Sequence, residues 1–145
     1  MFKHLLLPTD GSKLSERSVR HGIRMAVALN AKVTALHVVS KFHAFTYKTG
    51  MLGGTRSQYE AKSTEHAIAC LSFVKKVAQG ATVECDVVQA SSDQPFKEII
   101  KLARKKGCDL ILMASHGRRG MEGLLLGSET QKVLTHSSIP VLVYR

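Results

Sequence analysis

The chain has 145 residues, enough for one domain with a hydrophobic core. Hydrophobic residues make up 44% and charged residues 22%, which is typical of a globular protein. No apolar run approaches the ~20 residues that cross a bilayer, and the N-terminal stretch does not have the pattern of a signal peptide, so we expect a cytoplasmic protein. The net charge of +10 is spread over both halves of the chain and favours anionic ligands.

Strand and helix patterns alternate along the whole chain. Apolar runs predict strands at residues 2–8, 32–39, 81–89, 108–114 and 139–145. Apolar residues at helical spacing predict helices at residues 12–30, 57–79, 94–107 and from Ser128 onward. This order predicts an α/β fold in a single domain: an open, twisted, parallel five-stranded sheet with right-handed crossovers and helices on both faces.

The first helix carries specific signals. Ser12 is expected to be its N-cap, because a serine side chain accepts a hydrogen bond from a free backbone N–H of the first turn. Its inward face is predicted to hold Val19, Ile23, Ala26 and Val27.

The third strand is predicted to lie at or near a sheet edge. Apolar Val83, Cys85 and Val87 alternate with charged residues, so one face of this strand is expected to meet water. The helix before it is expected to stop at Gly80.

The cysteines and histidines form no recognisable pattern. The three cysteines are far apart and include no CxxC pair, so neither a disulfide framework nor a zinc site is predicted. The histidines include no HxH or HxxxH pair, so we predict no metal ligands.

A glycine-rich segment, ASHGRRGMEGLLLGS, runs from Ala114 to Ser128 between a buried strand and a short helix. It lacks the lysine of a P-loop, and its glycines lack the spacing and place of a dinucleotide fingerprint. The remaining pattern has Gly117 just after a strand, then nine residues, then Gly127 and Ser128 at the start of a helix. The free N–H groups at the start of a helix are a binding site for anions. Ser128 and Gln131 have the spacing of a capping box, so Ser128 is predicted to cap this helix.

Over its whole length the sequence resembles the nucleotide-binding branch of the universal stress protein (UspA) superfamily. The family motifs P-x-D-x-S and G-x-x-G-x9-G-[ST] are matched at Pro8, Asp10, Ser12, Gly117, Gly127 and Ser128, and Ala114 stands at the first position of the second motif. Ala114 departs from the pattern, since the family has its first signature glycine there. The second strand ends in the family's H-V at His37 and Val38, and the last strand contains its P-V-L-V.

The resemblance implies a universal stress protein domain over residues 1–145 with strand order 3-2-1-4-5. In that order the connection reverses between the first and fourth strands, and ligands bind at such switch points. The implied ligand is an adenine nucleotide (ATP, AMP or cyclic AMP), with Mg²⁺ as the companion of ATP. The implied nucleotide-binding residues are Pro8, Thr9, Asp10, Val38, Met113, Ala114, Gly117, Arg118, Gly120, Gly127, Ser128 and Glu129.

We therefore predict a nucleotide-binding stress-response or signalling module with at most weak ATP hydrolysis. An ATP hydrolase or phosphotransferase is the alternative, although the chain shows neither a P-loop lysine nor paired carboxylates for two metals. A second alternative is a stress protein that acts through its dimer surface without nucleotide. The positive charge suits nucleic acid, but the interleaved aromatic residues of a single-strand binder are missing, so no specific nucleic acid is predicted, and no membrane partner.

The last strand is predicted to lie at the sheet edge and to join two copies of the chain. An apolar edge strand presents unpaired backbone groups that can pair with a second strand. In the family that this sequence resembles, the strand crosses between partners. The expected homodimer contacts are Ile139, Val141, Leu142 and Val143.

Overall fold

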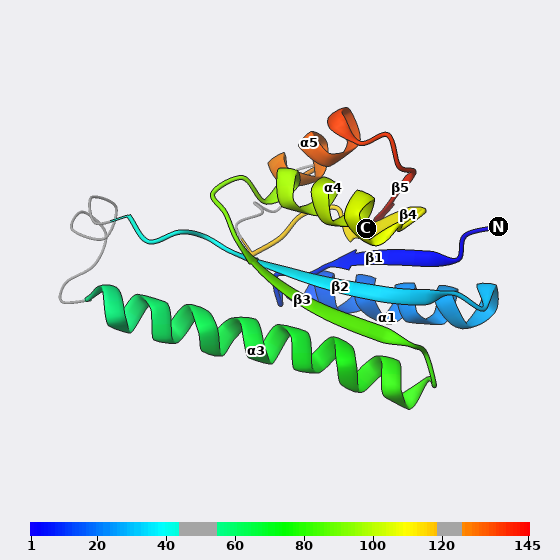
Figure 1. Ribbon diagram of the computed structural model, residues 1–145, viewed down its shortest axis with the longest axis horizontal. Helices are drawn as coiled ribbons and strands as arrows, with labels where there is room; N and C mark the ends of the chain where they lie inside the picture. Colours follow the sequence, from blue (N-terminus) through cyan, green and yellow to red (C-terminus); the bar gives the residue numbers. More distant parts are fainter. Residues whose placement is uncertain (44–54, 119–125) are drawn as a thin grey trace.

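A computed structural model of the protein describes residues 1–43, 55–118 and 126–145, in which strands and helices alternate (Figure 1). The strands are β1 (His4–Pro8), β2 (Lys32–Val39), β3 (Cys85–Ser91), β4 (Leu110–Ala114) and β5 (Val141–Tyr144). The helices are α1 (Lys13–Leu29), α3 (Arg56–Gly80), α4 (Pro95–Lys106) and α5 (Ser128–His136). Within these residues, no helix is both long enough and apolar enough to cross a membrane.

The strands form one parallel sheet in the order β3-β2-β1-β4-β5, which confirms the predicted fold class and strand order. Leu5 of β1 pairs with Val33 on one side and Leu110 on the other, so β1 lies in the middle of the sheet. Every residue of β4 is buried, as expected for a strand covered on both faces. β3 and β5 are the two edges, as predicted.

Helices α1 and α3 cover one face of the sheet, and α4 and α5 cover the other (Figure 1). Alternate residues of β1 therefore serve two separate cores: Leu5 and Leu7 face α1 and α3, while Leu6 faces α4 and α5. The three layers are therefore two helices, the sheet, and two more helices.

The prediction for α1 is right about the cap and wrong about one core residue. The Ser12 hydroxyl accepts a hydrogen bond from the Ser15 N–H at 3.2 Å, which confirms the N-cap. Val27 is 54% exposed, whereas Gly22 is buried against Leu7. At 100° per residue, Val27 falls at the margin of the buried stripe, on the side away from Gly22.

The prediction for β3 is displaced along the chain, because the strand runs from Cys85 to Ser91 and starts later than expected. Val87, on the face that the alternation predicts to be apolar, is 38% exposed. Cys85 packs against the core beneath α1 and α3, while Val88 and Ala90 pack against the core beneath α4 and α5. An outermost strand is covered only in part on either face, and strict alternation therefore overstates how much of it is buried.

Helix α3 begins with a capping box that the sequence reading missed. The Thr55 hydroxyl accepts from the Gln58 N–H at 3.2 Å, and the Gln58 side chain accepts from the Thr55 N–H at 3.0 Å. The helix ends at Gly80, as predicted, and Ala81 is its C-cap.

Candidate functional site

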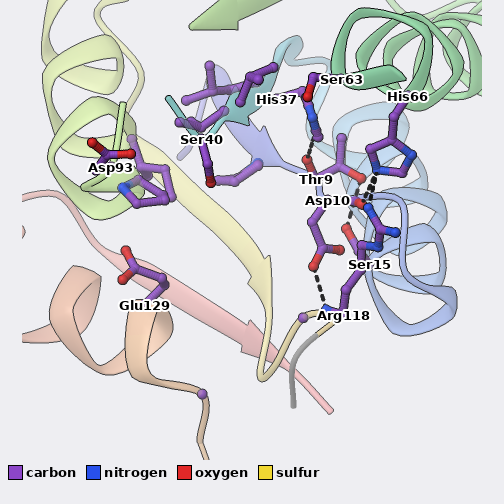
Figure 2. Close-up of a pocket in the computed structure, with 18 of the residues that line it drawn as sticks. Thr9, Asp10, Ser15, His37, Ser40, Ser63, His66, Asp93, Arg118 and Glu129 are labelled. Carbon is purple, nitrogen blue, oxygen red and sulfur yellow. Dashed lines mark hydrogen bonds between the residues drawn. The ribbon is translucent and has the colours of Figure 1, made fainter. Parts of the chain in front are cut away.

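The ends of β1, β2 and β4 open into a cleft of about 1150 Å³ at the carboxyl edge of the sheet (Figure 2). The cleft lies at the junction of β1 and β4, where the strand order reverses. The predicted nucleotide-binding residues that line it are Pro8, Thr9, Asp10, Val38, Met113, Ala114, Gly117, Arg118, Gly127, Ser128 and Glu129. Gly120 lies outside the described residues. The tertiary structure therefore brings together residues that are separated by up to 121 positions in the chain.

The Asp10 carboxylate links the two loops at this junction. Its Oδ1 accepts a hydrogen bond from the Ser12 N–H at 3.0 Å, which helps to start α1. Its Oδ2 accepts from the Arg118 N–H at 2.7 Å, which anchors the segment after β4 (Figure 2). Asp10 thus fixes the floor of the cleft, with both of its oxygens already engaged by backbone groups.

Gly117 is required by the close approach of this carboxylate. A β-carbon at position 117 would overlap Asp10 Oδ2 and would lie 3.2 Å from Asp10 Cγ. The backbone of Gly117 is not in the left-handed region, so the contact with Asp10, rather than turn geometry, excludes a side chain. This reason depends on a residue more than 100 positions away and could not be read from the loop itself.

Replacing Gly117 with alanine is expected to lower the free energy of unfolding by about 1–3 kcal/mol, the usual cost of overpacking. The added methyl group must push Asp10 away from the Arg118 N–H. Urea denaturation measures this loss. Gly80→Ala is the matched control, because a β-carbon there meets no atom within 4 Å, and alanine is the better helix former. Equal stability changes in the two variants would contradict the proposed contact.

Helix α5 begins one residue earlier than the capping-box prediction requires. Gly127 is the N-cap: its carbonyl accepts from the Gln131 N–H at 3.0 Å, and its own N–H donates to the Ser115 carbonyl at 2.7 Å. Ser128 is the first helical residue, and no side chain caps the helix, so the predicted Ser128 cap is wrong. Glycine suits the cap position because a β-carbon there would lie 3.1 Å from His116 Cα.

The first turn of α5 has backbone donors that are not used within the helix. Within the described residues, the N–H groups of Ser128, Glu129 and Thr130 have no hydrogen-bond acceptor. The Thr130 hydroxyl donates to the Ala114 carbonyl at 3.0 Å, which fastens α5 to the end of β4. The Glu129 carboxylate accepts from the Phe96 N–H at 2.9 Å and so caps α4. The side chains of Glu129 and Thr130 therefore bond to other elements, and all three residues of this turn line the cleft.

The β2 side of the cleft holds a buried histidine. His37 Nδ1 lies 2.8 Å from the Thr9 carbonyl oxygen, so this nitrogen carries the proton and donates (Figure 2). Burial lowers the pKa of His37, and the imidazole is therefore neutral near pH 7. The hydrogen bond fixes β2 to the end of β1 at the cleft floor.

Several residues of the cleft were not found from the sequence. Asp93, which follows β3, accepts from His43 Nε2 at 2.7 Å and from the Lys41 N–H at 3.1 Å. The hydrogen bond from His43 is the main cause of the lowered pKa of Asp93. Helix α3 adds Lys62, Ser63 and His66 to the opposite wall. No local signal marks them, because their place depends on where a long helix passes the sheet edge.

The sheet order and the cleft at its switch point define a doubly wound α/β protein of the kind that holds a ligand at the carboxyl edge. The sequence model of the universal stress protein family matches residues 1–145. Universal stress protein MJ0531 of Methanocaldococcus jannaschii is 32% identical over 149 aligned positions, which cover 100% of this chain and 83% of the relative. The chain therefore belongs to the universal stress protein family.

Solved structures agree with this assignment. The structure of protein MJ0577, a universal stress protein of M. jannaschii, has a TM-score of 0.82 at 29% identity and covers 99% of this chain and 96% of its own. A universal stress protein in complex with cAMP has a TM-score of 0.71 at 21% identity, with coverage of 99% and 97%. One from Archaeoglobus fulgidus in complex with dAMP has a TM-score of 0.68 at 16% identity, with coverage of 100% and 98%. At these two lower identities the likeness supports the fold.

Proposed function

We propose that this protein binds an adenine nucleotide in the cleft and acts as a stress-response or signalling module. The observation that carries the proposal is that the N–H groups of Ser128, Glu129 and Thr130, at the β1–β4 switch point, have no acceptor among the residues that the structure describes. Such a helix start favours an anion through its donors and its dipole. In this proposal the nucleotide phosphates lie against Gly127 and the first turn of α5.

The charges and shape of the cleft support the proposal. Lys41, Lys62 and Arg118 line it and favour a polyanion, in keeping with the net charge of +10. Pro8, Val38 and Met113 supply an apolar part that suits a purine base. The volume of about 1150 Å³ is somewhat larger than that of ordinary small-molecule sites and leaves room for a nucleotide.

The ligand-bound relatives favour adenine among the bases, since the printed ligands of two of them are cAMP and dAMP. Ala114, which stands in place of the family's first signature glycine, is buried at the end of β4 and lines the cleft. The Ala114 carbonyl accepts a hydrogen bond from the Thr130 hydroxyl. Compared with glycine, Ala114 therefore adds a methyl group to the site.

Calorimetric titration of the purified chain with Mg-ATP, AMP and cyclic AMP tests the proposal. We expect at least one of them to bind with one nucleotide per chain, and Mg-GTP to bind more weakly. An absence of heat with all three adenine nucleotides would contradict nucleotide binding and favour action through the protein surface alone. Steady-state phosphate release faster than about 1 s⁻¹ would instead favour the alternative of an ATP hydrolase.

The edge position of β5 supports a second proposal, a homodimer joined through this strand. The outer edge of β5 pairs with no other described strand, and Leu142 is 37% exposed. An exposed apolar edge favours pairing with a second copy. Ile139 and Val141 also pack against the chain's own core, so the dimer contact would rest mainly on Leu142 and Val143. Sedimentation at tens of micromolar is expected to give a dimer, and a monomer would contradict the proposal.

A further inference from the structure

Three metal-ligating side chains lie close together beside the cleft, and two of them, His37 and His66, line it. His37 comes from β2, and His66 and Cys70 come from α3. One ligand atom of each lies within 4.8 Å of the other two. We infer that His37, His66 and Cys70 bind a zinc ion or another divalent cation that accepts nitrogen and thiolate ligands, with a fourth position open to the cleft. Figure 2 shows His66 across the cleft from Glu129, so this site is separate from the start of α5.

His37 is already in the form that a metal ligand needs. Its Nδ1–H donates to the Thr9 carbonyl at 2.8 Å, so the lone pair of the neutral ring is on Nε2. Metal-bound histidines usually donate their other N–H to a carbonyl or carboxylate, which fixes the ring and makes the bound nitrogen more basic. The side chain is 5% exposed, so its orientation is held by the surrounding structure.

His66 and Cys70 are spaced for chelation. They lie four positions apart on α3 and therefore share one face of the helix. His66 Nε2 and Cys70 Sγ are 3.3 Å apart. In tetrahedral zinc sites, with bonds of about 2.0–2.1 Å to nitrogen and about 2.3 Å to sulfur, two such ligand atoms stand about 3.5 Å apart. Small adjustments of the side chains would suffice.

Gly11 keeps the cluster open on the side of the β1–α1 loop. A β-carbon at this position would lie 2.6 Å from Cys70 Sγ and 3.0 Å from His66 Cε1. Gly11 has a φ of +78°, which glycine adopts without strain. The absence of a side chain at this position also leaves room for the ligand atoms of Cys70 and His66.

A cationic group already occupies the position next to His66. Arg118 Nη1 lies 3.1 Å from His66 Nε2, and the Asp10 carbonyl oxygen lies 2.9 Å from the same nitrogen. The exposed Arg118 side chain must leave when a metal binds. Because a carbonyl oxygen only accepts hydrogen bonds, His66 Nε2 carries a proton when it bonds Asp10, so metal binding requires the neutral His66 ring to carry its proton on Nδ1 instead. Burial raises the pKa of the Cys70 thiol, so the Cys70 proton passes to the buffer as the metal–sulfur bond forms.

The inference does not depend on nucleotide binding, and its test omits nucleotide. Titration of the full-length, reduced chain with Co²⁺ is expected to give one ion per chain, with a thiolate-to-cobalt charge-transfer band and the intense visible bands of four-coordinate Co²⁺. Zn²⁺ is expected to displace the Co²⁺. Cys70→Ser should abolish the charge-transfer band, and His66→Gln should weaken Co²⁺ binding by more than about 10-fold.

Two further variants make the assignment specific. Cys85→Ser is the matched control, because Cys85 is a free cysteine on β3 outside the cluster, and it should keep the band. Arg118→Ala should tighten Co²⁺ binding by about 5-fold, since a positive charge beside the metal is removed. If Cys70→Ser does not fold by circular dichroism, His66→Gln decides, because His66 lies on a partly exposed face of α3. An unchanged band in Cys70→Ser, its loss in Cys85→Ser or no band in the wild type would overturn the inference.

Discussion

Replacing Ser128 with aspartate is expected to weaken Mg-ATP binding by more than about 100-fold while leaving the fold intact. The new carboxylate would stand at the first position of α5, beside the N–H groups assigned to the phosphates. Two unit charges about 5 Å apart repel by about 3 kcal/mol at an effective dielectric constant near 20. The same carboxylate favours the helix dipole and should raise the free energy of unfolding by about 0.3–1 kcal/mol. Calorimetry and urea denaturation measure the two effects.

Because Ser128→Asp is expected to weaken ATP binding and to raise the free energy of unfolding, a loss of affinity cannot be mistaken for unfolding of the protein. Thr135→Asp is the control, because it adds the same charge to α5 near the other end of the helix. It should lower stability, through the unfavourable helix dipole, and leave the ATP affinity unchanged. If Ser128→Asp and Thr135→Asp weaken ATP binding equally, the cause is the lower net charge of the protein and not a charge placed beside the phosphates. If neither weakens it, the phosphates bind elsewhere.

Replacing Leu142 with lysine is expected to convert the proposed dimer into a monomer. Leu142 lies in the middle of the edge strand β5, where a charged side chain opposes pairing with a second strand. Loss of a central apolar contact costs about 2 kcal/mol or more, which corresponds to at least about 30-fold in the dimer dissociation constant. Sedimentation velocity over a range of concentrations measures this change.

Ile68→Lys provides the comparison for this experiment. Ile68 is 59% exposed on α3, which packs against β2 and β3 at the other side of the sheet. This variant makes the same kind of change and should remain a dimer. Dissociation by Ile68→Lys, or a dimer that survives Leu142→Lys, would place the interface away from β5.

The sequence by itself determined the type of most helices and strands and their order along the chain. β1 and β4 are short apolar runs, HLLLP and LILMA, because a central parallel strand is buried on both faces. Ser12 could be identified as the start of α1 because the hydrogen bond of this N-cap joins two residues only three positions apart, Ser12 and Ser15. In each case the cause lies within one segment, so the segment carries the signal. The order of strands came from the family resemblance, and it places the ends of β1 and β4 side by side.

Only the tertiary structure decided contacts between distant segments. Gly117 has no side chain because Asp10 approaches it, and Gly127 caps α5 because the backbone of His116 is close. Val27 and Val87 follow an apolar pattern but lie where the neighbouring layer does not cover them.

The cluster of His37, His66 and Cys70 shows the same limit most clearly. The histidines are 29 positions apart and belong to different elements, so the search for closely spaced pairs could not connect them. The spacing of His66 and Cys70 was visible, but a pair on one helix does not form a site. The third ligand arrives because α3 packs against β2, and side-chain packing between layers is not encoded in any local repeat of the sequence.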